Sequence, residues 1–293
     1  MPEHHPIRGA LLCVASLALF ACMDTVTKYL TQTHAVPLIV GVRYLGNLAL
    51  MVAFLGPTHG RQMVRTRRTG LVWVRAFCLA VASLLIGLAL ARMPVAEVTA
   101  ITFLSPILLV AVAGRLLGER VGWVGWTAAL AGFAGVMLIV RPGSDILASG
   151  AAFVLGAVLL NLGYQLLSRV LAASESTFAL LFYTALAGSI IYGLAMPWYL
   201  EDRAPSLLEA AMFASLGLFG GVGHFMFTAA FRHAPASLIA PLNYIQLLWA
   251  GLLGWLVFGH IPDAQSLLGM AIVAGSGVMV ALKTRTPPPK RTA

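Results

Sequence analysis

Long apolar runs, separated by short segments with proline, glycine or charged residues, constrain this chain more than any other feature. A helix needs about 20 apolar residues to cross a hydrocarbon core of roughly 30 Å. Backbone groups in lipid must be hydrogen-bonded within the protein, which leaves helices or closed barrels. The runs are too long, and too apolar on both faces, for barrel strands. Charged residues make up only 10% of the chain, against roughly 25% in soluble domains. The sequence therefore predicts an all-α integral membrane protein.

The apolar runs predict ten transmembrane helices. They are expected near residues 9–30, 36–56, 70–91, 94–116, 121–140, 147–169, 176–198, 207–231, 235–258 and 264–283. Separators such as Gly56-Pro57 and Pro205 mark their ends, because proline cannot continue a helix without losing a hydrogen bond. The segment 285–293 is rich in proline and basic residues, and we expect a disordered tail there.

The distribution of lysine and arginine predicts how the helices are oriented in the membrane. With the N-terminus inside, thirteen of the 19 basic residues lie in inner segments and four lie in outer segments. The remaining two, Arg43 and Arg75, fall within spans. The positive-inside rule therefore places both termini in the cytoplasm, and an even number of spans requires both ends on one side. The predicted location is a bacterial inner membrane.

A weak internal repeat relates the two halves of the chain. Three residues of the first half, Ala89, Arg92 and Ala96, recur in the second half as Ala229, Arg232 and Ala236. An odd number of crossings per half would turn the copies upside down relative to each other, as in many transporters that bind substrate at the midplane. We predict a five-helix repeat over 1–146 and a second, inverted repeat over 147–284.

Short motifs at equivalent places in the two halves carry a family resemblance. The first half has Pro94-Val95-Ala96-Glu97-Val98-Thr99-Ala100, then Leu104-Ser105-Pro106 and Leu117-Gly118-Glu119-Arg120. The second half has Ala240-Pro241-Leu242-Asn243-Tyr244-Ile245-Gln246, then Val257-Phe258-Gly259-His260. With the ten spans and the repeat, these motifs resemble the EamA-like branch of the drug/metabolite transporter superfamily, most of all the bacterial amino acid exporters of the aromatic amino acid type.

The resemblance implies a ten-helix transporter with one central cavity between the two halves. Arg43 fits the arginine that the family carries in its second span. His260 departs from the family pattern, because it stands where a glutamate matching Glu119 is usual. That departure puts an ion pair at the end of the second-half helix in doubt.

Ionisable residues within the spans are the first candidates for a functional site, because a charge at the bilayer centre costs about 2.5–3.5 kcal/mol on insertion scales. Asp24 and Lys28 lie four residues apart on one helix face, where they can pair and meet a zwitterion. Alternatively, Lys28 extends to the outer interface and Asp24 pairs with Arg43. Arg43 is too deep to reach the interface, so a partner such as Asp24 is expected. Arg75 lies near the inner end and is expected to extend toward the interface. Glu97 begins the fourth span, where an acid suits a helix N-terminus.

Neutral polar residues on later spans predict further parts of the site. Asn161, Tyr164, Gln165 and Ser168 share one helical face, which should look toward a cavity or another helix. His224 lies within the eighth span and could couple transport to protons or bind a backbone carbonyl.

The ninth span adds an amide and aromatic cluster after a proline. Asn243, Tyr244, Gln246 and Trp249 follow Pro241, which can kink the helix and free a carbonyl, as Pro106 can in the fourth span. Such a segment suits either a binding wall or packing. The full predicted cavity set is Asp24, Lys28, Arg43, Ser83, Glu97, Thr99, Phe103, Asn161, Tyr164, Gln165, His224, Asn243, Tyr244, Gln246 and Trp249.

The leading functional hypothesis is a secondary or facilitative exporter of amino acids or related small metabolites, which works by alternating access between the repeats. The alternative is a carrier for another metabolite or a cationic drug, such as a vitamin or a nucleoside-like compound. A channel would need rings of pore-lining charge, and a membrane hydrolase would need motifs such as Gly-x-Ser-x-Gly. Neither pattern is visible in the sequence.

Composition limits the remaining partners. The net charge of +9 comes from scattered loop residues without an aromatic-interleaved basic surface, so we expect no nucleic acid. The cysteines lie in apolar segments without ligand spacing, and no metal, cofactor or catalytic residue is expected. The partners are predicted to be a small-molecule substrate and the lipid bilayer. One bundle can enclose a site, so we expect a monomer.

Overall fold

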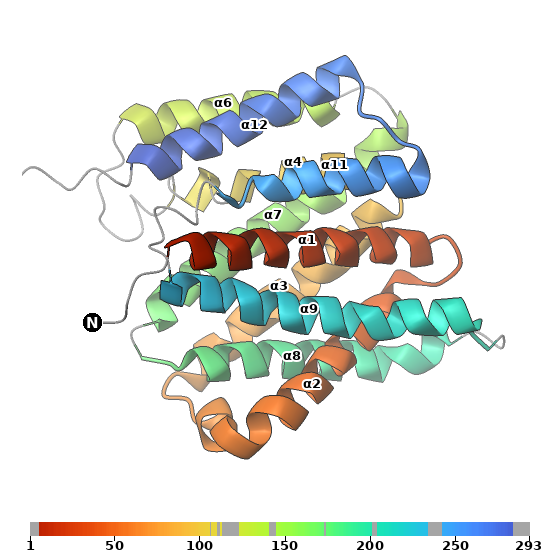
Figure 1. The fold of residues 1–293 in the computed structure, drawn as a ribbon, viewed down its shortest axis with the longest axis vertical. Helices are drawn as coiled ribbons and strands as arrows, with labels where there is room; N and C mark the ends of the chain where they lie inside the picture. The colour runs from red at the N-terminus through yellow and green to blue at the C-terminus, as the bar shows by residue number, and fades with distance from the viewer. Residues whose placement is uncertain are drawn as a thin grey trace, which may run out of the picture.

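The computed structural model describes residues 6–105, 107–109, 112, 123–140, 145–172, 174–200, 204–233 and 242–283, and every regular element within these ranges is a helix (Figure 1). The helices are α1 (Pro6–Leu30), α2 (Val36–Val64), α3 (Thr69–Leu90), α4 (Val95–Thr102), α6 (Trp123–Val140), α7 (Asp145–Leu171), α8 (Thr177–Ala195), the 3-10 turn η1 (Met196–Tyr199), α9 (Leu207–His233), α11 (Ile245–Phe258) and α12 (Ala264–Lys283). The predicted kink residues Pro106 and Pro241 lie outside the described residues.

Six helical segments in the described ranges are long and apolar enough to cross a membrane. They are Ile7–Leu30, Val36–Val64, Thr69–Leu90, Ser149–Ser168, Thr177–Tyr199 and Leu207–Phe227. Four shorter apolar helices accompany them: Val95–Leu109, Trp126–Ile139, Ile245–Phe258 and Ala264–Met279. The all-helical membrane fold is therefore confirmed, whereas the number of ten crossings stays a prediction.

The helices pack mainly in pairs that join the first half of the chain to the second. The most extensive contacts are α1–α9, α2–α8, α3–α7 and α6–α12, and α4 packs on α11. Exchanging the two predicted repeats maps the α1–α9 pair onto the α7–α3 pair, and each of the other three pairs onto itself. Such a pattern means that neither half can bury its apolar helix faces alone. The start of α1 and the end of α12 lie at the same end of the bundle (Figure 1).

Helix α2 runs further than the sequence predicts. Its span was expected to stop at Gly56-Pro57, but the helix continues through Pro57 to Val64. Met63 explains the extension, because it is only 3% exposed and joins Met51 and Ala185 in an apolar cluster. Burial of that side chain against α8 offsets the hydrogen bond that proline removes.

A close approach between α2 and α9 depends on glycine. A Cβ atom on Gly217 would lie 2.9 Å from the Cα atom of Gly46, and a Cβ atom on Gly46 would lie 3.2 Å from the Cα atom of Gly217. Small residues of this kind let membrane helices approach to backbone contact. Gly217 and Gly46 are therefore close-packing residues at the contact between α2 and α9.

We predict that Gly217→Leu destabilises the bundle by about 1–3 kcal/mol, the usual cost of inserting atoms into a filled contact. The check is reversible unfolding in mixed micelles, followed by circular dichroism. Gly275→Leu is the matched control, because a Cβ at Gly275 meets nothing within 4 Å. Equal stability of the two variants would show that the α2–α9 contact does not require glycine.

Candidate functional site

A cavity of about 1100 Å³ lies inside the bundle and is lined by α1, α2, α3, α4, α7, α8 and α9, with Asn243 just before α11 and Gln246 in its first turn. Most of the predicted site residues line it: Asp24, Arg43, Ser83, Thr99, Phe103, Asn161, Tyr164, Gln165, His224, Asn243 and Gln246. Four predicted residues do not: Lys28, Glu97, Tyr244 and Trp249. The cavity draws its wall from both predicted repeats.

Two charged side chains face this cavity from neighbouring helices. Asp24 on α1 and Arg43 on α2 are each partly exposed to it and close enough to interact electrostatically. The Arg43 guanidinium lies 5.4 Å from the centre of the Tyr44 ring. Within the described part of the chain, Asp24 makes no hydrogen bond or ion pair, so the predicted pairs with Lys28 and Arg43 do not form. Both charges are therefore available to a ligand.

Arg75 has a different role from the one its position predicts. It was expected to extend toward the interface, but it is only 4% exposed. Its guanidinium donates to Ser168 Oγ at 2.6 Å and Tyr164 Oη at 2.8 Å, and to the carbonyl of Leu180 and Oγ1 of Thr184, each at 3.0 Å. These bonds tie α3 to α7 and α8, and they fix the Tyr164 ring in the cavity wall.

The polar stripe of α7 divides between the cavity and the neighbouring helices. Asn161, Tyr164 and Gln165 line the cavity. Gln165 Nε2 also donates to Ser105 Oγ at 2.9 Å, which links α7 to the fourth predicted span. The hydroxyl of Ser168 donates to the Tyr164 carbonyl at 2.6 Å and takes no part in the wall. Both uses that the sequence allowed, cavity lining and interhelical bonding, occur on this one face.

Aromatic rings form a second part of the wall. Phe20 on α1 lies against His224 on α9, with ring centroids 4.9 Å apart, and against Phe227 at 6.2 Å. Phe103, after α4, lies 4.8 Å from the ring of Tyr244. Together with Tyr164, these rings offer flat apolar surfaces beside the polar groups, an arrangement that suits a ring-containing ligand.

The contribution to the cavity wall of α8, and of the part of α2 that follows Arg43, was not predicted from the sequence. Thr184 on α8, and Asn47, His59 and Gln62 on α2, also line the cavity. Asn47 follows Arg43 by four residues, so their shared helix face is a signal that could have identified it. Thr184 stands alone in an apolar helix, and nothing in the sequence distinguishes it from a packing residue.

The cavity reaches the surface at the end of the bundle that holds the α2–α3 connection. Its lining there includes Gln62 and Thr177, which are both exposed. Nearby, the Glu175 carboxylate accepts hydrogen bonds from the backbone N–H groups of Arg67 and Arg68, at 2.8 to 3.1 Å. This contact holds the α2–α3 connection against the start of α8, beside the opening.

At the opposite end, Lys28, Glu97 and His260 form a closing cluster. Lys28 Nζ donates to the carbonyl oxygens of Leu90 and Met93, at 2.9 and 2.7 Å. His260 Nε2 lies 3.0 Å from Glu97 Oε1, and so joins the end of α11 to the first turn of α4. No residue of 31–35 or 91–94 lines the cavity. His260, which departs from the family motif, thus forms a contact with Glu97 that joins two helices.

The backbone before His260 explains how the side chain reaches Glu97. Gly259 ends α11 in the left-handed conformation, with φ of 66°, and its N–H bonds to the Trp255 carbonyl at 2.9 Å. Glycine adopts this conformation without the steric cost of a Cβ. The turn stops the helix and directs the next residue toward α4.

Among the described residues, no group of three His, Cys, Asp or Glu side chains is placed to hold a metal ion. Cys13, Cys22 and Cys78 are free thiols. Cys13 is buried, and its Sγ lies 3.8 Å from Oδ1 of Asn243, as a weak donor to a cavity residue.

The apolar helices enclose a cavity that reaches the surface at one end of the bundle, and comparison with known proteins identifies the class of this membrane protein. The chain belongs to the EamA-like transporter family, which matches residues 7–141 and again 148–282. The resemblance to the EamA-like family noted from the motifs is therefore confirmed, whereas the likeness to aromatic amino acid exporters is not shown. Each match covers one predicted repeat apart from its margins.

Curated relatives are carriers of different small metabolites. A riboflavin transporter of Vibrio cholerae is 28% identical over 92% of both chains. An S-adenosylmethionine uptake transporter of Rickettsia bellii is 26% identical over 88% of both chains. A pseudopaline exporter of Pseudomonas aeruginosa is 26% identical over 90% of this chain and 93% of the relative. The protein is therefore a membrane transporter of small metabolites.

A solved crystal structure shares the fold. It aligns with a TM-score of 0.69 at 19% identity, over 95% of this chain and 99% of that chain. At this identity the likeness supports the helical arrangement and carries no information on substrate.

We predict that Arg75→Gln lowers stability by about 2–3 kcal/mol, because buried hydrogen bonds to a charged group are lost and their acceptors stay buried. Unfolding in mixed micelles measures the change. Arg65→Gln at an exposed position is the control. If both variants unfold alike, the guanidinium does not support the contact between α3, α7 and α8.

We also predict that His260→Ala opens the closed end more often, since it removes the contact between α11 and α4. The measurement uses Ile86→Cys, a cavity position, in a chain whose three native cysteines are replaced by alanine. A membrane-impermeant thiol reagent added from the closed side should label it severalfold faster in the His260→Ala background.

Arg92→Gln provides the control for that experiment, because Arg92 is exposed at the same end and lies just after α3. It donates to the Leu88 carbonyl at 2.9 Å and lies 4.9 Å from the centre of the Phe153 ring of α7, so these contacts do not join α11 to α4. Faster labelling with the control, or unchanged labelling with His260→Ala, would contradict a closing role for the Glu97–His260 contact.

Proposed function

We propose that this protein is a secondary or facilitative carrier that moves a small heteroaromatic metabolite by alternating access through the central cavity. One observation carries the proposal: a single cavity, walled by both halves of the chain, reaches the surface at one end and stops below a polar cluster at the other. A carrier needs such a one-sided arrangement, whereas a channel needs a continuous path.

The wall chemistry supports the substrate class. Flat rings at Phe20, Phe103 and Tyr164 offer stacking surfaces, and the amides of Asn161 and Asn243 offer hydrogen-bond donors and acceptors. Riboflavin and S-adenosylmethionine, which two relatives carry, each join a flat heteroaromatic ring to a polar chain. The volume of about 1100 Å³ is ample for a ligand of that size.

Amino acid export is the second candidate. Asp24 and Arg43 present opposite charges to one cavity, which is the arrangement that a zwitterion needs. The relatives named above carry riboflavin, S-adenosylmethionine and pseudopaline, and this favours the hypothesis of a vitamin or nucleoside-like carrier over that of an amino acid exporter.

The direction of access follows from the predicted orientation. The open end lies beside the α2–α3 connection, which contains Arg65, Arg67 and Arg68. Under the positive-inside rule this end is cytoplasmic, so the structure corresponds to an inward-open state. Transport then requires the Glu97–His260 contact to break as the open end closes. The relatives include both an uptake carrier and an exporter, so the net direction depends on the gradients.

Counterflow into liposomes tests the function. The purified protein is reconstituted into liposomes that are preloaded with unlabelled riboflavin, S-adenosylmethionine, tryptophan or alanine. Uptake of the same compound in labelled form is then followed. We expect saturable counterflow with riboflavin or S-adenosylmethionine and none with alanine. Counterflow with tryptophan alone would favour the amino acid exporter, and uptake that never saturates would contradict a carrier.

We predict that Asp24→Asn lowers kcat/KM for the transported compound about tenfold or more, since a hydrogen bond to a charged group contributes about 1.5–3 kcal/mol. Initial uptake rates at graded substrate concentrations give the value. Asp263→Asn is the control, because Asp263 lies outside the cavity and accepts from the Ser266 N–H at the start of α12. An unchanged kcat/KM in Asp24→Asn would show that the Asp24 carboxylate does not bind the substrate.

A further inference from the structure

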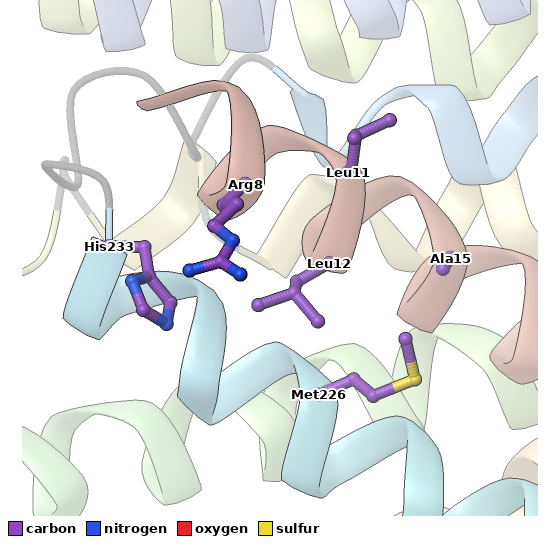
Figure 2. A pocket seen from close by; sticks show the side chains of 6 residues that line it. All are labelled: Arg8, Leu11, Leu12, Ala15, Met226 and His233. Carbon is purple, nitrogen blue, oxygen red and sulfur yellow. The ribbon is translucent and has the colours of Figure 1, made fainter. Parts of the chain in front are cut away.

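A second hollow, of about 570 Å³, lies between α1 and α9, away from the transport cavity. Side chains of both helices line it: Arg8, Leu11, Leu12, Ala15, Met226 and His233 (Figure 2). None of these residues lines the transport cavity. We propose that this hollow is a binding site for one anionic phospholipid.

The wall of the hollow suits an acyl chain. Leu11, Leu12 and Ala15 are spaced three to four residues apart, so they share one face of α1, and Met226 closes that face from α9. Leu11 is 64% exposed and the adjoining Ile7 is 75% exposed, which places this face toward the lipid. In a membrane, apolar side chains in this position contact hydrocarbon.

The mouth of the hollow suits a phosphate. Figure 2 shows the Arg8 guanidinium beside the His233 ring, at one end of the apolar wall. Within the described part of the chain, no acidic side chain lines the hollow and Arg8 forms no ion pair. Arginine presents forked donors that match phosphate oxygens, and histidine can supply a further donor.

The position of the hollow along the helices favours an anionic lipid over a zwitterionic one. Arg8 lies in the first turn of α1 and His233 ends α9, at the end of the bundle that also carries Arg61 of α2 and Arg65 just after it. The positive-inside rule makes this the cytoplasmic side, where anionic lipids concentrate and where basic pockets between membrane helices bind their headgroups. A choline group would bring a second positive charge beside the Arg8 guanidinium.

A bound lipid would act on the two helices that shape the transport cavity. The α1–α9 pair has the most extensive contact in the structure, and the same helices present Asp24 and His224 to the cavity. The lipid would span helices of the two predicted repeats, and so strengthen that contact. The site stands independently of the transported compound.

Native mass spectrometry of the purified full-length protein tests the proposal. Delipidated protein in detergent is titrated with phosphatidylglycerol or phosphatidylcholine of identical acyl chains, and bound lipid is counted by mass. We expect one phosphatidylglycerol to bind at least about fivefold more tightly than phosphatidylcholine, and Arg8→Gln to remove that preference, in line with about one basic residue near a charged surface.

Two further variants keep the test decisive. Arg61→Gln is the matched control, because it removes an exposed arginine from the same end outside the hollow, and it should leave the preference intact. Ala15→Trp fills the apolar wall and should weaken that one tight site for both lipids. The proposal is overturned if the two lipids bind equally, or if Arg61→Gln and Arg8→Gln have the same effect.

Discussion

Every polar group in the hydrocarbon layer must find a partner within the protein or face an internal cavity, and this constraint organises the structure. Arg75 satisfies it by pairing, with four hydrogen bonds to α7 and α8. Asp24 and Arg43 satisfy it by facing a cavity of about 1100 Å³. The same requirement therefore holds three helices together at one place and leaves charge available for a ligand at another.

Because helices of the two halves pack in pairs, both halves of the chain contribute to the wall of that cavity. Because α1 packs on α9 and α2 on α8, the cavity wall moves whenever one half moves against the other. Contacts at the closed end, Lys28 with the end of α3 and Glu97 with His260, are few and polar. Such contacts can exchange for water at modest cost, whereas the apolar faces stay buried throughout.

Much of the fold could be predicted from the sequence, because apolar length and helix-breaking residues are local signals. The helical face of Asn161, Tyr164 and Gln165 likewise identified cavity residues by spacing alone. Long side chains were harder to place. The sequence allowed Lys28 to pair with Asp24 or to extend to the outer interface, yet it bonds to the carbonyl oxygens of Leu90 and Met93, at and just after the end of α3. Which acceptor the Lys28 ammonium group binds depends on which helix end lies within its reach, and tertiary packing decides that.

The most direct test of alternating access locks the closed end. Glu97→Cys and His260→Cys are combined in a chain whose native cysteines are replaced by alanine, and a short bifunctional thiol reagent that can be cleaved by reduction links α4 to α11. The account predicts that counterflow of the transported compound stops on linkage and returns on reduction, while each single-cysteine variant is unaffected by the reagent. Continued counterflow through the linked protein would contradict it.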